Sequence, residues 1–580
     1  MRERWILETK KADFDGLAAK LSVPPLLVRC MVNRGLETEE EMRRYLYGGL
    51  EDLHDPRQMK GVLKAVELLR QAEARGEKAG IASDFDCDGI FSAYILWLGF
   101  RQIGLTANIY TPDRIIEGYG LNRRIVNEAK AAGVTVLVTC DNGIAANEEV
   151  AYAKEQGMTV IVTDHHEVQE ELPPADVVVD PKQDGETYPF CGLCGAGVAF
   201  KLICALYDAC GVAAEEKWKL LEYTAIATVA DVMELRDENR ILVKYGLQQL
   251  EKTSHVGLRA LLEVQGMAGK RLNAGHIGFV IGPCFNAAGR ISTVSASFDL
   301  LMETEYGEAL KKAQKLKEIN ETRKEMTEEG VKQASAMLEG KPLSDVLVLL
   351  LPDVHESLAG IVAGRIKENT GHPVIVFTRI SDSNVKGSGR SIEAYHMFHE
   401  LLSCKDLMSR FGGHKMAAGM TLPEANLPEL TRRLNEQSVL LPEDFCPVVR
   451  IDAPMPVGFA TERLVEEFGR MEPFGVGNPK PVFAEQHFSI LRAQQLGKDG
   501  NVLKMYVQNC LGNRCEAMLF RGKEEFEQFL VENFGGRELK RMYEGKENDI
   551  DVAFTYFPIV NEFRGSRTVQ IQVSGYCRIE

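Results

Sequence analysis

Acidic and histidine side chains recur in three short segments and could together hold divalent cations. The segments ASDFDCDG, TCDNG and TDHH contribute six of them: Asp84, Asp86, Asp88, Asp141, His165 and His166. Unpaired carboxylates at this density repel one another and raise each other's pKa, a cost that a bound cation removes. Imidazole nitrogen beside carboxylate oxygen suits Mn²⁺ better than Ca²⁺. The residue types therefore indicate a metal site built mainly from oxygen ligands.

Each segment also has an ordinary structural explanation. Asp is a common helix N-cap, so ASDFDCDG taken alone favours a capped or solvated acidic turn. A single His-His pair is more often a surface feature than a pair of ligands. Asp231, in ATVADVMEL, is explained equally well as a helix-terminal acid and as a ligand. Only the recurrence of acids along one series of elements favours a metal site.

The elements expected around these residues form an open parallel sheet. From about residue 78 to residue 181, β-rich runs alternate with amphipathic helical patterns, which predicts parallel strands buried on both faces. Four of the runs end at or next to an acid: Asp84, Asp141, Asp164 and Asp180. Ligands bind beyond the carboxyl ends of such strands, so these acids are expected to converge. Within ASDFDCDG, alternation along a strand predicts that the three acids point the same way and that Cys87 points away.

Enough ligands for two ions are available from six residues: Asp84, Asp86, Asp88, Asp141, His165 and Asp231. A two-metal hydrolase holds its ions ~3.5–4 Å apart, bridged by a carboxylate, and so stabilises both the attacking and the leaving oxygen. The set therefore predicts a two-metal phosphodiesterase.

Two glycine-rich segments in the second half of the chain suit phosphate binding. VKGSGRS offers backbone N–H groups, the Ser388 hydroxyl and the forked guanidinium of Arg390. RFGGHKMAAG offers Gly412 and Gly413, where backbone can approach a ligand closely, and His414. Each segment is weak evidence alone, because GSG is a common turn and a His after Gly is often structural.

Two further features bear on phosphate binding. Arg290, in FNAAGR, either reaches a substrate phosphate, caps the next helix or pairs with an acid. Between residues 379 and 415, Lys and Arg outnumber Asp and Glu, which reverses the balance of the whole chain. A polyanion is expected to dock at such a local reversal.

The composition limits the class of protein. The chain has 580 residues, 45% of them apolar and 26% charged, which allows about three or four globular domains. Its net charge of −16 argues against a protein that coats duplex DNA non-specifically, although a metal cluster can still supply positive field where phosphate binds. The chain lacks an apolar run of about 20 residues and an apolar secretory signal, so no membrane span is expected. Thirteen scattered cysteines predict reduced thiols in a cytoplasmic protein.

Changes in texture along the chain predict five parts. They are a helical segment at 1–55, an α/β catalytic domain at 56–302, Lys/Glu-rich linking helices at 303–342, a second α/β domain that binds substrate at 343–445, and a β-rich barrel or sandwich at 446–580. The last part is predicted from short alternating strands separated by turns. Cys191 and Cys194 form a CxxC without a second pair, so packed thiols are expected rather than zinc ligands.

The order of these motifs resembles a known superfamily. DFDCDG, CDNG, TDHH and ADV resemble the four motifs of the DHH phosphoesterases, and GSGRS and FGGH resemble those of their associated C-terminal domain. Together with EGYGLN and MEPFGVGNPKPVF, the pattern is most similar to the RecJ branch of single-strand-specific exonucleases. The resemblance covers the whole chain. It implies a DHH-type parallel-sheet domain, a long helical linker, a second α/β domain and a C-terminal OB-like β-barrel.

The resemblance also implies an activity and a set of site residues. The activity is 5′-to-3′ release of 5′-mononucleotides from single-stranded DNA with two Mn²⁺ or Mg²⁺ ions, in DNA repair and recombination. The implied metal ligands are Asp84, Asp86, Asp88, Asp141, His165 and Asp231, and the implied catalytic residues are His166, Asp141 and Asp84. Asp141 would bridge the ions and His166 would lie beside the scissile phosphate. The implied contacts to substrate phosphates are Arg290, Ser388, Arg390, Gly412, Gly413 and His414.

Two other functions remain open from the sequence. The chain could be a superfamily member that cleaves short oligonucleotides or cyclic dinucleotides, although such enzymes need no terminal barrel. It could also be a non-catalytic single-strand-binding scaffold, although every motif keeps its acids. Single-stranded DNA is the expected partner of a monomer that does not bind membranes, with a helicase or a single-strand-binding protein as a further candidate partner.

Overall fold

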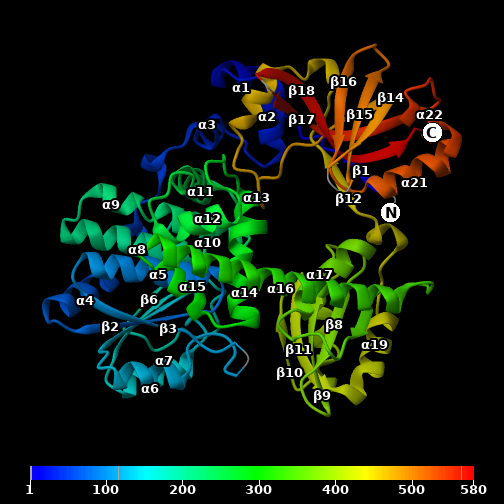
Figure 1. Cartoon of the computed structure of the whole chain (residues 1–580). Helices are drawn as coiled ribbons and strands as arrows, with labels where there is room; N and C mark the ends of the chain where they lie inside the picture. The colour runs from blue at the N-terminus through cyan, green and yellow to red at the C-terminus, as the bar shows by residue number, and fades with distance from the viewer. Residues whose placement is uncertain (1–2, 115, 498–499, 564, 580) are drawn as a thin grey trace. The chain divides into compact units, whose positions relative to one another are not determined.

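The structure is a computed structural model that describes residues 3–114, 116–497, 500–563 and 565–579 (Figure 1). The chain divides into two compact units, and each is described by itself. One unit consists of His54–Met233 and Leu242–Pro447, and the other of Glu3–Leu53, Glu234–Ile241 and Val448–Glu580. The predicted boundaries at 55, 302, 342 and 445 stay a prediction. Within the described ranges, no helix combines the length and the hydropathy that crossing a membrane requires.

The first unit begins with a five-stranded sheet in the order β3-β2-β4-β5-β6, in which every neighbouring pair is parallel. Its strands are β2 (Lys78–Ser83), β3 (Thr106–Tyr110), β4 (Val136–Cys140), β5 (Thr159–Thr163) and β6 (Val177–Val179). The predicted parallel sheet is therefore confirmed. All five residues of β4 are buried, as expected for a strand covered on both faces.

Helices cover both faces of this sheet (Figure 1). They are α4 (Val62–Ala74), α5 (Cys87–Gln102), α6 (Arg123–Ala131), α7 (Asn147–Glu155) and α8 (Gly195–Cys210). α6 and α7 lie on one face, and α4, α5 and α8 on the other. α6 is amphipathic: it buries Ile125, Val126 and Ala129 and exposes its charged residues. The alternation of strand and helix thus brings the carboxyl ends of β2, β4 and β5 to one edge.

The predicted strand geometry of the first acidic segment is wrong. β2 ends at Ser83, and Asp86 is already the N-cap of α5, with Asp88 in the first turn of that helix. Cys87 is the first residue of the helix and is buried, rather than alternating on a strand. The acids are therefore gathered by a tight turn into a helix, and the N-cap explanation and the site explanation both apply to Asp86.

A helical region follows the sheet. Its helices are α9 (Ala214–Trp218), α10 (Leu221–Ala230), α11 (Asp237–Leu250), α12 (Val256–Val264), α13 (Ala274–His276), α14 (Gly282–Ile291), α15 (Ser295–Leu301) and α16 (Tyr306–Leu338), with a π-helical turn, η3, at Ile277–Ile281. α16 is one uninterrupted helix of 33 residues that contacts α12, α14 and α15 and then α17 (Ala359–Thr370). The Lys/Glu-rich stretch predicted to link two α/β domains thus forms a single helix.

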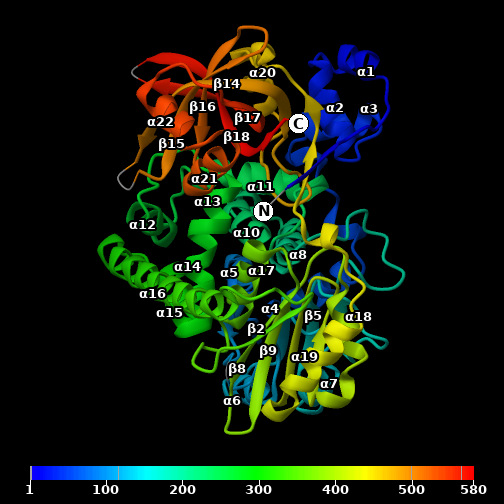
Figure 2. The ribbon, with the colours of Figure 1, turned by 90° about the vertical axis from the view of Figure 1, so that its right-hand side faces the viewer.

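The second sheet of this unit has the order β10-β11-β9-β8-β7. Its strands are β7 (Leu347–Leu350), β8 (Val374–Arg379), β9 (Asn384–Arg390), β10 (Arg410–Gly413) and β11 (Ala417–Pro423). Figure 2 shows strands β8 and β9 side by side. β7 and β8 are parallel, and the other pairs are antiparallel. α17 packs with α16 in a core that includes Val374 and Val376, whereas α18 (Met397–Leu402) and α19 (Leu427–Glu436) pack in a second core that includes Ile375 and Phe377.

The second unit contains a closed barrel of five strands. The barrel strands are β14 (Phe483–Leu496), β15 (Val502–Asn509), β16 (Arg514–Leu519), β17 (Asp551–Phe563) and β18 (Ser566–Arg578). β14 pairs with both β15 and β17, which closes the sheet. Two helices, α21 (Lys523–Phe534) and α22 (Gly536–Glu544), lie between β16 and β17. The predicted OB-like barrel is confirmed.

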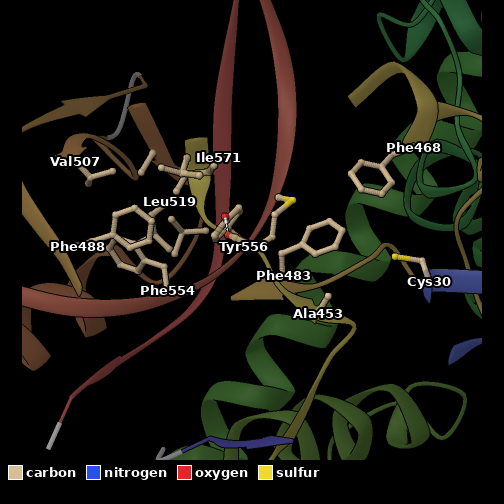
Figure 3. Close-up of a cluster of buried hydrophobic side chains, with 14 of the residues drawn as sticks. Cys30, Ala453, Phe468, Phe483, Phe488, Val507, Leu519, Phe554, Tyr556 and Ile571 are labelled. Atoms are coloured by element: carbon tan, nitrogen blue, oxygen red, sulfur yellow. Dashed lines mark hydrogen bonds between the residues drawn. The ribbon is translucent and has the colours of Figure 1, made fainter. Parts of the chain in front are cut away.

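The helical N-terminal segment shares a core with this barrel. The segment contains β1 (Arg4–Leu7), α1 (Phe14–Leu21), α2 (Pro25–Asn33) and α3 (Glu39–Tyr47), and the chain enters the barrel through β12 (Val448–Ile451), β13 (Ala453–Pro454) and α20 (Glu462–Gly469). β1 pairs in parallel with β12. Figure 3 shows Phe488, Phe554 and Tyr556 grouped in the core, and Cys30 of α2 belongs to the same cluster. The two ends of the chain therefore fold as one unit.

A buried ion pair joins these distant parts of the sequence. Arg34 is 8% exposed and donates to Asp452 Oδ1 at 3.0 Å, to the Cys30 carbonyl at 2.5 Å and to the Pro479 carbonyl at 2.6 Å. Asn33 Nδ2 also donates to Asp452 Oδ1, at 3.1 Å. Both oxygens of Asp452 and both terminal nitrogens of Arg34 have hydrogen-bond partners, whereas Arg34 Nε has none in the described structure; the pair fixes how α2 meets the barrel.

We expect Asp452→Ala to destabilise the unit by about 3–5 kcal/mol, because it leaves the Arg34 guanidinium buried without its counter-charge. Urea-induced unfolding of the full chain measures the loss. Asp549→Ala, at an exposed position of the same unit, is the control and should stay within about 0.5 kcal/mol of the wild type. Equal stability of the two variants would show that the ion pair does not stabilise the unit.

Candidate metal centre

All six predicted metal ligands meet at the carboxyl edge of the first sheet. Three groups of side chains have ligand atoms that lie within 4.8 Å of one another: Asp84, Asp86 and Asp141; Asp88, His165 and Asp231; and Asp141, His165 and His166. Asp141 and His165 each belong to two of the groups. The acids therefore form two adjoining clusters, and Asp141 lies where a bridging carboxylate would stand.

Backbone N–H groups hold the acids of the first segment. Asp86 Oδ1 caps α5 by accepting from Gly89 N at 3.0 Å. Asp88 accepts from Gly195 N at 2.7 Å and Ala196 N at 2.8 Å, the first residues of α8. Because a helix N-terminus favours negative charge, the start of α8 suits the buried carboxylate of Asp88. The site thus depends on the meeting of α5 and α8, which also pack against each other.

Asp141 follows β4 in a left-handed backbone conformation, with φ at +59°. Asp tolerates this conformation better than most residues because its short side chain can hydrogen-bond locally. The turn lies against Gly195, where an added Cβ would come within 2.7 Å of Asp141 Cβ. The Tyr119 hydroxyl donates to the Asp141 carbonyl at 2.5 Å. Gly195 is therefore needed for the close approach of α8 to the acid at the centre of the site.

Asp164 positions both histidines, a role that the sequence did not predict. Its Oδ1 accepts from His165 N and from His166 Nδ1, both at 2.8 Å, and its Oδ2 accepts from Ile144 N at 2.9 Å. His165 Nε2 then lies 3.1 Å from Asp141 Oδ1 and 3.8 Å from Asp231 Oδ2. Asp231 itself is the C-cap of α10. The Asp164 carboxylate thus fixes the ring of His166, whereas it holds His165 through the backbone.

The electrostatics of the cluster disfavour the charged state of its acids when no cation is bound. Burial and the neighbouring carboxylates raise the pKa of Asp84 and of Asp141 well above the usual range. The same causes raise the pKa of Asp231 to about 8. Two atoms that could bind a ligand, Asp84 Oδ1 and His165 Nδ1, are buried and accept or donate no hydrogen bond in the described structure.

This donor set fits divalent cations of the Mn²⁺ and Mg²⁺ class. It offers mostly carboxylate oxygen with one buried imidazole, and burial lowers the pKa of His165 so that the ring is neutral and able to bind metal. Cations would also remove the mutual repulsion of the acids.

His166 differs from His165 in charge and exposure. Its side chain is 46% exposed, and its Nδ1 bonds to Asp164. Partial burial opposes the charged form, but the hydrogen bond and the charge of Asp164 raise the pKa of His166 to about 9. His166 is therefore an imidazolium at neutral pH, suited to a negatively charged ligand rather than to a cation.

Arg114 and Arg290 have no carboxylate partner in the described structure and stand near the acids, and Arg390, which also has none, lies near Arg290. Arg114 lies 4.7 Å over the Phe85 ring, within the acidic loop. Arg290 donates to the Ser357 carbonyl at 2.8 Å, so it neither caps a helix nor pairs with an acid. Burial and the neighbouring Arg114 lower the pKa of Arg290 to about 10. Such a cluster favours an anion that is not part of the protein.

The glycine-rich segments lie on one face of the second sheet. Arg390 Nη1 donates to Ser388 Oγ at 3.3 Å, and the ladder places Ser388 opposite Gly419 and Gly419 opposite Gly412. A Cβ added at Gly412 or at Gly419 would meet nothing within 4 Å, so the face is bare backbone beside Ser388.

The other two residues predicted beside Gly412 shape the β10–β11 hairpin. Gly413 has φ at +150°, and a Cβ there would meet the Ala417 carbonyl at 2.4 Å. His414 N donates to that same carbonyl, at 2.8 Å. Their predicted contacts with phosphate stay a prediction.

The sequence missed Arg114, Tyr119 and Gly195, and it placed Asp164 among the converging acids without predicting its role. Tyr119 lies in EGYGLN, which carried the family resemblance but no role. The prediction of packed thiols in CxxC is wrong for Cys191, which is exposed; Cys194 is buried as the N-cap of α8 and accepts from Gly197 N at 3.4 Å.

Comparisons with known proteins identify three domains in this order. Residues 78–230 match the DHH family, N-terminal domain; residues 344–438 match the DHHA1 domain; and residues 451–575 match the RecJ OB domain. The matched ranges include both sheets and the barrel, so the predicted fold class is confirmed.

Relatives with described functions match nearly the full chain. The chain is 36% identical to the single-stranded-DNA-specific exonuclease RecJ of Bacillus subtilis over 87% of its own length and 64% of that protein. It is 34% identical to the RecJ of Salmonella typhimurium over 98% of its length and 99% of that protein. The crystal structure of Thermus thermophilus RecJ with Mn²⁺ has a TM-score of 0.81 and 28% identity, and covers 100% of this chain and 80% of that one. The chain therefore belongs to the RecJ family of single-stranded-DNA-specific exonucleases within the DHH superfamily.

Proposed function

We propose that the protein degrades single-stranded DNA from the 5′ end and releases 5′-mononucleotides, with two Mn²⁺ or Mg²⁺ ions. One observation carries the proposal: two acid clusters joined at Asp141 lie near the half-buried Arg114 and Arg290, which have no carboxylate partner in the described structure. The acids suit cations, and the arginines suit phosphate. A phosphodiester next to a terminal phosphate satisfies both.

Hydrolysis breaks the bond between phosphorus and the 3′ oxygen of the first nucleotide. Cations held by Asp84, Asp86, Asp88, Asp141, His165 and Asp231 would supply the Lewis acidity that polarises the phosphate and acidifies the attacking water. Protonated His166 donates to a non-bridging oxygen of the scissile phosphate, and Asp164 holds its ring in place. Asp84, behind Asp86, adds negative charge that retains cations.

The arginines supply the polarity of digestion in this proposal. A terminal 5′-phosphate carries more charge than a diester, so a cluster of Arg114, Arg290 and Arg390 with the Ser388 hydroxyl prefers a strand end. Each cleavage leaves a new 5′-phosphate on the shortened strand, which can bind the same groups. An internal segment of a strand, bound for endonucleolytic cleavage, would offer these arginines only the single negative charge of a phosphodiester.

The barrel provides a surface for unpaired bases. Along β15, Lys504 and Tyr506 face outward, and the Lys504 ammonium lies 5.2 Å from the Tyr506 ring centre. Arg492 of β14 stands opposite Tyr506 in the ladder. Alternating aromatic and basic side chains suit single strands, where each stacked base contributes ~1–3 kcal/mol. Roles in repair and recombination, a helicase or single-strand-binding partner, and a monomeric state are proposed from the family resemblance.

We expect Asp141→Asn to reduce Mn²⁺-dependent digestion of a 5′-labelled single strand by about 100-fold or more, because it removes the shared carboxylate. Asn accepts the left-handed backbone, so the apo protein should still unfold cooperatively. Mn²⁺ should raise the Tm of the wild type but much less that of the variant. Asp299→Asn, at an exposed position of α15, is the control. Full turnover by Asp141→Asn would exclude a bridging role.

The stability of the metal-free protein should fall as pH rises. Burial and repulsion raise the pKa of Asp231 to about 8, whereas an unfolded Asp titrates near ~3.9. A group whose pKa is higher in the folded than in the unfolded protein stabilises the fold at pH values below the unfolded pKa. This contribution is lost as the pH rises through the folded pKa. In chelator, the Tm should therefore fall between about pH 4 and pH 8, and Mn²⁺ should restore it most at the upper end. A Tm that does not change with pH in chelator would contradict the expectation that the acids of the cluster ionise in this pH range.

We expect Arg390→Gln to reduce kcat/KM about 10-fold or more on a 5′-phosphorylated strand and clearly less on a 5′-hydroxyl strand. The reason is that Arg390 is half-buried beside Ser388, and the described structure gives it no carboxylate partner. Arg365→Gln, on the exposed face of α17, should change neither rate. Equal losses on both strand ends would show that Arg390 does not read the terminal phosphate.

A further inference from the structure

A lysine on the far side of the acid clusters from the arginines has no role in the function proposed above. Lys182 follows β6, and its Nζ lies 3.0 Å from Glu167 Oε1. Its side chain is 26% exposed, whereas that of Glu167 is 84% exposed. The backbone N–H of Lys182 donates to the fully buried Asp180 at 2.8 Å, so the start of this loop is fixed.

The order of the strands places this lysine relative to the acids. Val179 of β6 pairs with Thr163 of β5 at the end of the ladder, so the turn that contains Lys182 leaves the sheet at the same edge as the TDHH segment. β6 is two strand positions from β4, which Asp141 follows directly, a separation of about 10 Å. One nucleotide of an extended strand together with a lysine side chain can cover this distance. The field of Lys182 also reaches His165 and Asp231.

Positive charge thus lies on both sides of the acids. Arg114 is on the loop after β3, at one end of the strand order, and Lys182 is on the loop after β6, at the other. A strand with its terminal phosphate at the arginines and its scissile phosphate at the acids would run on towards β6. Its next phosphate would then arrive at Lys182.

From this arrangement we propose that Lys182 binds the phosphate that follows the scissile one, and that Glu167 holds the lysine in place until DNA displaces it. The inference rests on the proposed function and adds a contact on the 3′ side of the cleaved bond. An exposed ion pair contributes little to stability, so a DNA phosphate can replace Glu167 as the partner of Lys182. Glu167 competes for the lysine and lowers the affinity for strands that reach β6.

Two short substrates isolate this contact. A 5′-phosphorylated dinucleotide has a terminal and a scissile phosphate but none beyond, and a 5′-phosphorylated trinucleotide adds one. Lys182→Ala should raise KM for the trinucleotide about 10-fold and for the dinucleotide less than about 2-fold. Glu167→Gln should lower KM for the trinucleotide. Lys182→Arg, which keeps the positive charge, should have a KM for the trinucleotide close to that of the wild type.

Two further measurements separate a phosphate contact from a structural role. Binding of a longer single strand, followed in chelator as salt is raised, should have a log–log slope smaller by about 0.7 for Lys182→Ala, because one phosphate contact is lost. A trinucleotide whose third phosphate is a neutral methylphosphonate should be bound equally by the wild type and by Lys182→Ala. Lys154→Ala is the matched control, since Lys154 pairs with Asp176 at 2.5 Å at the opposite edge of the sheet.

The outcomes separate this inference from the proposed function. Equal losses on dinucleotide and trinucleotide, or an unchanged salt slope, would overturn the role of Lys182 and leave the exonuclease proposal standing. A wild type that cleaves no phosphorylated strand in Mn²⁺ would refute the proposed function and this inference together.

Discussion

The repulsion between buried carboxylates is the constraint on which the site depends. Asp84, Asp86 and Asp141 lie within 4.8 Å of one another, and burial adds to the cost of their charge. Backbone N–H groups, whose positions do not depend on side-chain motion, hold acids of the site in place. Gly195 N, for example, donates to Asp88. Because α8 must approach so closely, Gly195 cannot carry a Cβ. The structure thus stores an unfavourable electrostatic term that divalent cations relieve.

A protein with a net charge of −16 can still bind a polyanion because its charge is unevenly distributed. Many of its surface cations are paired with acids, for example Lys154 with Asp176. Arg290 and Arg390 are different: both are half-buried, and the described structure gives neither a carboxylate. A few unneutralised guanidinium groups in a partly desolvated position attract phosphate more strongly than many paired ones at the surface.

The sequence predicted the sheet and the convergence of its acids because both follow from periodicity and chain order. Parallel strands with helical crossovers bring Asp141 and His165 to one edge whatever the side-chain detail. It could not predict roles that depend on contacts between distant segments. Asp164 was expected only to converge with the other strand-end acids but bonds to two histidines, Arg114 has no motif around it, and Cys30 shares a core with residues more than 400 positions away. The prediction for Asp86 was wrong because it continued the strand into residues that form the N-terminus of α5.

Helix α14 links the acids to the phosphate-binding groups of the second sheet. Asn286 Oδ1 accepts from Cys87 N at 2.8 Å, at the start of α5, and a Cβ at Gly289 would meet the Phe85 carbonyl at 2.4 Å. Four residues after Asn286, on the same face of the helix, Arg290 donates to the Ser357 carbonyl just before α17. A shift of α14 would therefore move the acidic loop and the arginine together. In the proposed function, one helix rather than a loop sets the distance from the acids to the groups proposed to bind the terminal phosphate, which suits an enzyme that removes one nucleotide at a time.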